Sequence, residues 1–146
     1  MAWRARPPDE HASVIELGVR WDPGATSPHL LQSERRTLLA FYIGPTDPAY
    51  TDVLADVGVI EWRRCRGAIL GSPNIDALHG HRLWHKGLRE AGHYGAAEVR
   101  NSAWIAATLR VLSAHEGYDS ARWRGLRHFI LSFHDSTFES ALGNSS

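Results

Sequence analysis

The segment 126–138, Leu-Arg-His-Phe-Ile-Leu-Ser-Phe-His-Asp-Ser-Thr-Phe, constrains the fold most strongly because two kinds of side chain alternate along it. In a strand, successive side chains point to opposite faces of the sheet. One face then carries Phe129, Leu131 and Phe133, and the other carries His128, Ile130, Ser132 and His134. We predict that the aromatic face is buried against a helix and that the other face lines a small-molecule pocket. A shift of one residue would exchange the two faces.

The rest of the pattern predicts three further strands and one helix. Alternation indicates a half-buried strand over 14–21, and a continuous apolar run indicates a central strand over 36–43. Residues 57–70 are typical of a long strand with two mixed faces. A helix is expected over 101–115, where apolar residues recur at helical spacing after an Asn-Ser pair that can cap it. These elements predict an α+β fold: a curved, mainly antiparallel sheet with one principal helix packed on one face.

Length and composition limit the classes of protein to consider. The 146 residues predict a single domain over 1–146, with loosely ordered ends at 1–12 and 140–146. Lysine plus arginine and aspartate plus glutamate both number 16, and this balance argues against a nucleic-acid binder, which needs surplus positive charge. The chain shows no apolar run of about 20 residues that would span a membrane, and its single cysteine, Cys65, cannot form an internal disulfide. We expect a cytoplasmic protein whose partner is a small-molecule ligand, without nucleic-acid or membrane partners; a homodimer is left open.

The candidate catalytic residues lie on and just after the last predicted strand. His134 is expected to be the general base, since an imidazole titrates near neutral pH. Asp135 or Glu139 would orient it, and His128 or His81 would be the partner acid. Neighbouring residues of a strand point apart, so a pair between His134 and Asp135 needs a bulge or a strand end at that point. Alternatively, Asp135 and the residues after it only make backbone hydrogen bonds at the strand terminus. The ligand-binding candidate on the same face as His128 is Ser132.

The segment 76–97 is rich in glycine and histidine, which favours an irregular but ordered loop with a function. We expect a lid that carries His79, His81 and Trp84 to the mouth of the pocket. On an extended segment, His79 and His81 would point the same way, so a divalent metal held by them and a third ligand is an alternative. The other alternative is a loop that only joins a strand to the helix. We predict no cofactor, because the sequence lacks the glycine-rich motifs of nucleotide-binding loops.

Four stretches resemble the pattern of a group of small bacterial proteins of unassigned function. They are 127–139, which contains Phe-His-Asp-Ser-Thr-Phe-Glu, 28–34 (Pro-His-Leu-Leu-Gln-Ser-Glu), 78–81 (Leu-His-Gly-His) and 98–105 (Glu-Val-Arg-Asn-Ser-Ala-Trp-Ile). The resemblance implies no activity, but it implies that the family pattern includes His79, His81, Glu98, Asn101, Trp104, His134, Asp135 and Glu139. On this basis Glu98 joins the ligand-binding candidates. After Glu139 the chain continues Ser-Ala-Leu, where the similar proteins continue Cys-Val-Ala.

These features favour a small bacterial enzyme of specialised metabolism that acts on a small organic molecule by histidine–carboxylate acid–base chemistry. An isomerase, cyclase or lyase that needs no cofactor fits best, because no redox or nucleotide-binding motif is present. The first alternative is a binding module for a small molecule or a protein, and the second is an enzyme with a histidine-ligated metal. A histidine within about 3 Å of a carboxylate inside a cleft would favour the enzyme.

Overall fold

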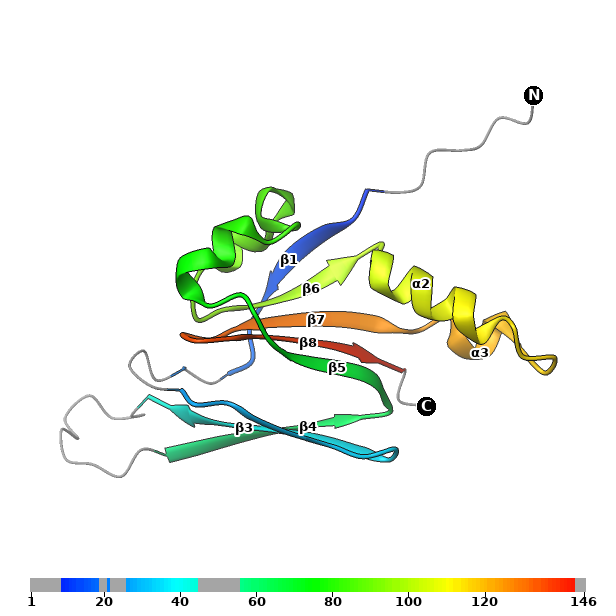
Figure 1. The fold of residues 1–146 in the computed structure, drawn as a ribbon, viewed down its shortest axis with the longest axis horizontal. Coiled ribbons are helices and arrows are strands. Elements are labelled where there is room, and N and C mark those ends of the chain that lie inside the picture. The colour runs from blue at the N-terminus through cyan, green and yellow to red at the C-terminus, as the bar shows by residue number, and fades with distance from the viewer. Residues whose placement is uncertain (1–8, 19–20, 22–25, 45–55, 144–146) are drawn as a thin grey trace.

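The computed structural model describes residues 9–18, 21, 26–44 and 56–143 (Figure 1). Their strands form two antiparallel sheets, one of five strands and one of three. The helices lie on the side of the five-stranded sheet that faces away from the three-stranded sheet (Figure 1). The predicted α+β class, with an antiparallel sheet and a helix on it, is confirmed.

The five-stranded sheet has the order β1-β6-β7-β8-β5. Its strands are β1 (His11–Ile15), β5 (Cys65–Gly71), β6 (Ala96–Arg100), β7 (Arg127–Ser132) and β8 (Thr137–Leu142). The loosely ordered ends that we predicted are wrong where they overlap with β1 and β8, and residues 1–8 and 144–146 lie outside the described residues. The strand predicted over 14–21 overlaps β1 at two residues, while its positions 19–20 are outside the described part of the chain.

The three-stranded sheet has the order β2-β3-β4. It contains β2 (His29–Gln32), which sequence reasoning missed, β3 (Arg36–Ile43), predicted with these bounds, and β4 (Asp56–Arg63). The predicted strand over 57–70 is two strands, because Arg64 takes a φ of +52° between β4 and β5. A left-handed residue turns the chain sharply, so β4 and β5 enter different sheets.

The main core fills the space between the two sheets. Phe129 and Leu131 of β7 and Phe133 just after it are buried as predicted, but against the second sheet and not against a helix. Their partners from the other sheet and from β8 are Leu39, Phe41, Trp62 and Phe138, with Trp21 beside them. Most of the aromatic pairs in this core are tilted, for example Phe41 and Phe133 with centroids 5.2 Å apart, which is a favourable pair geometry, whereas Trp62 and Phe138 are stacked.

A second core covers the opposite face of the five-stranded sheet. The segment predicted as an irregular lid forms three short helices: η1 (Ile75–Gly80), η2 (Trp84–Lys86) and α1 (Leu88–Ala91). Each helix, or the turn just before it, supplies a buried leucine to this core: Leu78, Leu83 and Leu88. The prediction of an irregular loop is therefore wrong, because these leucines anchor the segment on Ala97, Val99 and Ile130 of the sheet.

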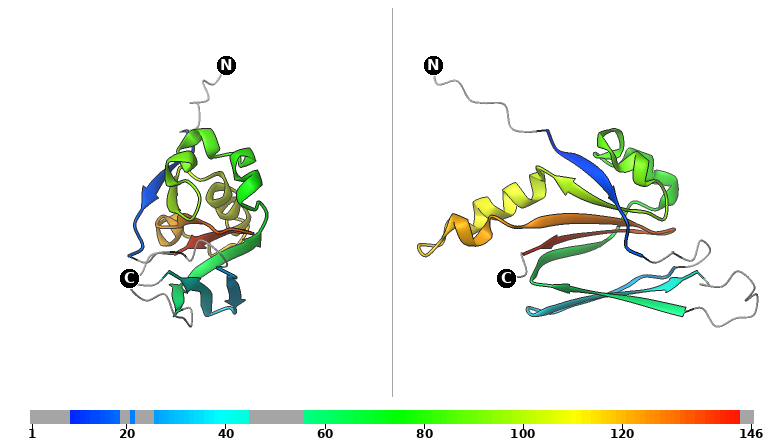
Figure 2. Two further views of the ribbon diagram at one scale, coloured as in Figure 1. Left: turned by 90° about the vertical axis from the view of Figure 1, so that its left-hand side faces the viewer. Right: turned by 180° about the vertical axis from the view of Figure 1, so that it is seen from behind.

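The principal helix, α2 (Ala103–Leu112), is shorter than predicted but has the expected cap, since Ser102 Oγ accepts a hydrogen bond from the Ile105 N–H at 3.2 Å. The short helix α3 (Ser120–Trp123) follows, capped by Asp119, whose side chain accepts a hydrogen bond from the Ala121 N–H. Views from two further sides place α2 and α3 at one end of the large sheet and α1 at the other (Figure 2). The five-stranded sheet is thus covered on both faces.

Residues 126–138 do not form one strand but the hairpin of β7 and β8. A turn over 133–136 joins them, closed by the Phe133 N–H donating to the Ser136 carbonyl at 2.8 Å. The face of β7 opposite the phenylalanines is also buried, with His128 and Ile130 fully inaccessible. The sheet is covered on both sides, so that face does not line an open pocket as we predicted, and His134 lies in the turn instead of on the strand.

Candidate functional site

The two strands of the hairpin bring a histidine and a glutamate together on the helix-covered face. In the register of β7 and β8, Glu139 is opposite Ile130, and His128 is opposite Ala141, so both polar side chains share one face. The Nε2 atom of His128 lies 2.8 Å from Oε1 of Glu139. His128 is fully buried, whereas the Glu139 side chain is 22% exposed. The hydrogen bond gives the buried imidazole a charged partner.

The other ring nitrogen of His128 is bonded to the N-cap of α2. Ser102 Oγ lies 2.8 Å from His128 Nδ1, although the two residues are 26 positions apart in the chain. Because Asn101, with a φ of +54°, turns the chain between β6 and α2, the cap lies directly beside β7. The result is a continuous hydrogen-bonded chain of Ser102, His128 and Glu139.

A second imidazole faces the same carboxylate. His81 follows η1 and places its Nε2 atom 3.6 Å from Oε2 of Glu139. Its Nδ1 atom accepts a hydrogen bond from the Leu83 N–H at 3.1 Å, so in the neutral ring the proton is on Nε2 and faces Glu139. Each oxygen of Glu139 therefore has its own imidazole.

These contacts control the ionisation of Glu139. Burial raises its pKa, but the hydrogen bonds and positive charge of His128 and His81 outweigh burial and lower the pKa from 4.5 to about 2. Glu139 is thus ionised at neutral pH and acts only as an acceptor. The proton in its bond to His128 is consequently on Nε2, and Nδ1 of the neutral ring accepts from the Ser102 hydroxyl. This is the tautomer in which His128 can take the serine proton.

Trp104 of α2 covers the histidine from above the sheet. Its ring meets the His128 ring edge-on, with centroids 5.1 Å apart and an angle of 85°. The indole also lies over Gly67 of β5, where a Cβ atom would approach the ring to 3.1 Å. A glycine at that position leaves room for the indole beside His128, whose side chain is fully inaccessible to water.

Ser102 also lines a cavity of about 490 Å³ beneath α2. We call it the α2 cavity; it is lined by 98–102 of β6 and the cap, by Ile105, Ala106 and Leu109 of α2, and by 124–127. Glu98 and Arg127 form a two-bond ion pair in its wall at 2.9 and 2.8 Å. The hydrogen bond to Arg127 lowers the pKa of Glu98. The serine is the member of the hydrogen-bonded chain that borders this space.

The structure separates the other predicted residues from this chain. His134 and Asp135 do pair, with Nδ1 and Oδ1 3.0 Å apart, and they do so at a strand end, but their side chains are 43% and 87% exposed in the turn. Ser132 is buried. Trp84 packs against the second core with its ring near His93, and His79 is exposed in η1. Of the predicted set, the structure joins His128, Glu139 and His81.

The metal alternative required His79 and His81 to lie on one extended segment. His79 lies instead in a 3₁₀ helix, so the two histidines do not have that arrangement. Within the described residues, no group of three or more histidine, cysteine, aspartate or glutamate side chains is arranged to hold a metal ion. Sequence reasoning recognised Ser102 only as a helix cap. The Asn-Ser pair before an amphipathic helix was the one local signal, and it says nothing about the histidine that the cap meets.

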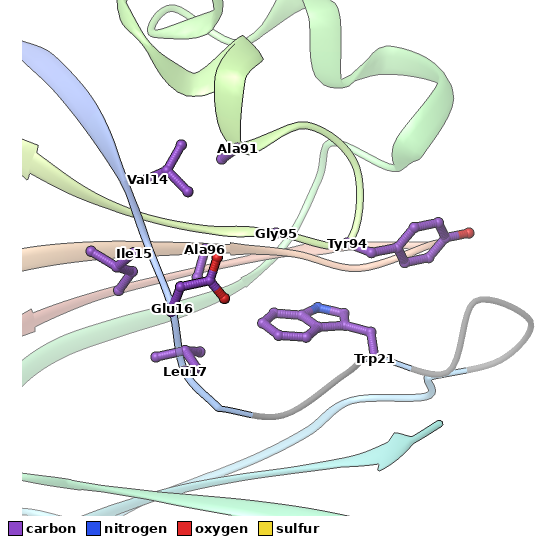
Figure 3. Close-up of a pocket in the computed structure, with 9 residues that line it drawn as sticks. All are labelled: Val14, Ile15, Glu16, Leu17, Trp21, Ala91, Tyr94, Gly95 and Ala96. Carbon is purple, nitrogen blue, oxygen red and sulfur yellow. The ribbon is translucent and has the colours of Figure 1, made fainter. Parts of the chain in front are cut away.

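A second cavity, of about 330 Å³, lies between the end of β1 and α1. Figure 3 shows its lining, with the Trp21 indole opposite Ala91 and Gly95 and with Glu16 at its edge. The Trp21 Nε1 atom is buried and has no hydrogen-bond partner within the described residues. None of the predicted site residues lines this cavity, so we do not include it in the candidate site.

Comparison with protein-family models, curated proteins and solved structures gave no match. The helices of the described part of the chain lack the length and apolar character needed to cross a bilayer. The hydrogen-bonded chain of Ser102, His128 and Glu139 is therefore the feature of the molecule that indicates a function.

Proposed function

We propose that this protein is an enzyme that cleaves an ester of a small organic molecule, with Ser102 as nucleophile and His128 as general base. The observation that carries the proposal is the chain of two 2.8 Å hydrogen bonds that runs from the cavity-lining Ser102 through His128 to Glu139. A nucleophile bonded to a base, with the base bonded to an orienting carboxylate, is the arrangement that activates a serine hydroxyl.

The reaction would proceed in two steps. Ser102 Oγ forms a bond to the ester carbonyl carbon while its proton passes to Nδ1 of His128, and the ester C–O bond breaks as the alcohol leaves with that proton. Water then attacks the acyl carbon and gives a proton to His128. The acid is released, and the proton returns to Ser102. Glu139 stays ionised throughout, consistent with a pKa of about 2, and stabilises the imidazolium.

This assignment changes the roles expected from the sequence. The histidine–carboxylate chemistry is retained, but the base is His128 and not His134, whose side chain is partly exposed in a turn away from Ser102 and Glu139. His81 would hold the second oxygen of Glu139. Cleavage of an ester is favoured over the expected isomerase, cyclase or lyase because the buried imidazole reaches the cavity only through a hydroxyl group.

The test is reaction with a fluorophosphonate, which phosphonylates an activated serine with loss of fluoride. We expect one label per chain, located on Ser102 by peptide mass analysis. S102A should abolish labelling, and E139Q should slow it by about 100-fold or more. S113A, a change at an exposed serine at the other end of α2, and H134A should label like the wild type. Absence of labelling on Ser102 in the folded wild-type protein would contradict the proposal.

The helix cap favours a second candidate, a binding module without catalysis. Ser102 Oγ accepts the Ile105 N–H, so the same hydroxyl has a structural use in α2. In that case the α2 cavity holds a ligand, and no covalent bond forms. Ligand binding without any fluorophosphonate labelling would support this module.

A homodimer and a cytoplasmic location, both considered from the sequence, remain expectations. Light scattering on the purified chain would test the first, since a monomer has a mass of 16.3 kDa.

A further inference from the structure

The charges around the α2 cavity do not balance. Its lining includes Arg100, Arg124 and Arg127 but only one acid, Glu98. The carboxylate of Glu98 has both oxygens bonded to Arg127, which neutralises that pair. Arg124 forms no hydrogen bond or ion pair within the described residues, and Arg100 interacts with Glu98 only through its charge. Two positive charges therefore remain at the cavity.

The α2 side of the same cavity is apolar. Ile105, Ala106 and Leu109 recur at helical spacing along the helix, and Leu126 is a further apolar residue of the lining. Apolar walls with a few polar groups are typical of sites that bind and orient small molecules. Ser102 is also part of this lining, so a bound molecule would contact both the apolar wall and the serine.

We propose that the α2 cavity selects a substrate with an apolar body and one carboxylate, which Arg124 and Arg100 recognise. A guanidinium is well suited to this role because its planar N–H groups match the two oxygens of a carboxylate. The inference rests on the proposed function in one respect: the esterase proposal supplies the idea that the bound molecule is an ester that reacts with Ser102. Recognition of the anion does not require the Ser102 hydroxyl, so it can be measured in S102A.

The test compares two compounds with the same apolar body. In the S102A protein, isothermal titration measures the binding of 4-phenylbutyrate and of its neutral amide. We expect the carboxylate to bind about 10-fold more tightly, as a charged hydrogen bond would provide. Adding R124Q or R100Q should remove most of this preference. R110Q, which changes an exposed arginine of α2 outside the cavity lining, should retain it.

The outcomes separate this inference from the proposed function. Equal binding of the two compounds, or no binding of either, overturns the inference even if fluorophosphonate labels Ser102. A preference for the carboxylate that R110Q removes as fully as R124Q also overturns it. A preference that depends on Arg124 and Arg100 without any labelling supports the inference and overturns the esterase.

Discussion

At the scale of the single residue, Glu139 is the group on which the site depends. Both of its oxygens face imidazole Nε2 atoms, from His128 at 2.8 Å and from His81 at 3.6 Å. A half-buried carboxylate without partners would have a raised pKa, whereas here the two histidines lower it. The negative charge of Glu139 also keeps the neutral His128 ring in one tautomer. The same hydrogen bond therefore accounts for the ionisation of Glu139 and for the tautomer of His128.

The lowered pKa makes stability depend on pH. Because the folded-state pKa is below its ordinary value, Glu139 stabilises the fold above about pH 5, and this contribution is lost as the pH falls toward 2. The contribution is at most about 3 kcal/mol. We expect E139Q to be less stable at pH 6 and to lose less stability between pH 5 and 2, measured by urea denaturation. E116Q, at an exposed glutamate, should follow the wild-type profile, and an identical profile for E139Q would contradict the assignment.

At the scale of the element, the short helices are held on the sheet by a close backbone contact. Gly87 precedes α1 with a φ of +106°, and a Cβ atom there would collide with the Ala12 carbonyl of β1. This glycine therefore allows α1 to approach the edge strand, which keeps Leu88 buried. The helices η1, η2 and α1 in turn hold His81 beside Glu139.

Gly87→Ala should consequently destabilise the protein. The cost combines strain at a positive φ with displacement of the backbone, and we expect about 2 kcal/mol or more. Gly80→Ala is the matched control, because among the described residues no atom beyond its two chain neighbours and the backbone of its own helix lies within 4 Å of the Cβ position, and its φ is not positive. Thermal unfolding followed by circular dichroism measures both variants. Equal melting temperatures for the two would show that the contact is not needed.

At the scale of the whole molecule, the five-stranded sheet has a core on each face. Trp62 of β4 links the two sheets by contacting Phe129 and Phe138, each with ring centroids 5.6 Å away. The aromatic core is the larger of the two, and the helix-covered core is the one that borders the site. Loss of the packing between the two sheets should therefore lower the free energy of unfolding of the entire domain.

We expect Trp62→Ala to lower the free energy of unfolding by about 4 kcal/mol, since it removes a buried ring and leaves a cavity. Val111→Ala, at a side chain that is 75% exposed, should change it by less than about 0.5 kcal/mol. Urea titrations followed by circular dichroism give both values. A small effect of Trp62→Ala would mean that the three-stranded sheet contributes little to folding.

The sequence alone determined features that depend on neighbouring residues. It predicted the bounds of β3, the buried face formed by Phe129, Leu131 and Phe133, and a cap for α2 at the Asn-Ser pair, of which the structure uses the serine. Periodicity and side chain–backbone hydrogen bonds act over a few positions, so a local pattern is sufficient to predict them. The same reasoning merged β7 with β8 because the apolar alternation does not mark the turn between them.

Only the tertiary structure decided which parts of the molecule pack against the two faces of β7. Phe129 of β7 and Phe133 just after it pack on a second sheet and not on a helix. His128 joins Ser102, His81 and Glu139 from separate parts of the chain. His134, next to a carboxylate in sequence, was the more conspicuous histidine, yet it lies partly exposed in the turn between β7 and β8. Strand pairing and helix docking bring distant residues together, and these long-range contacts leave no periodic signal in the sequence.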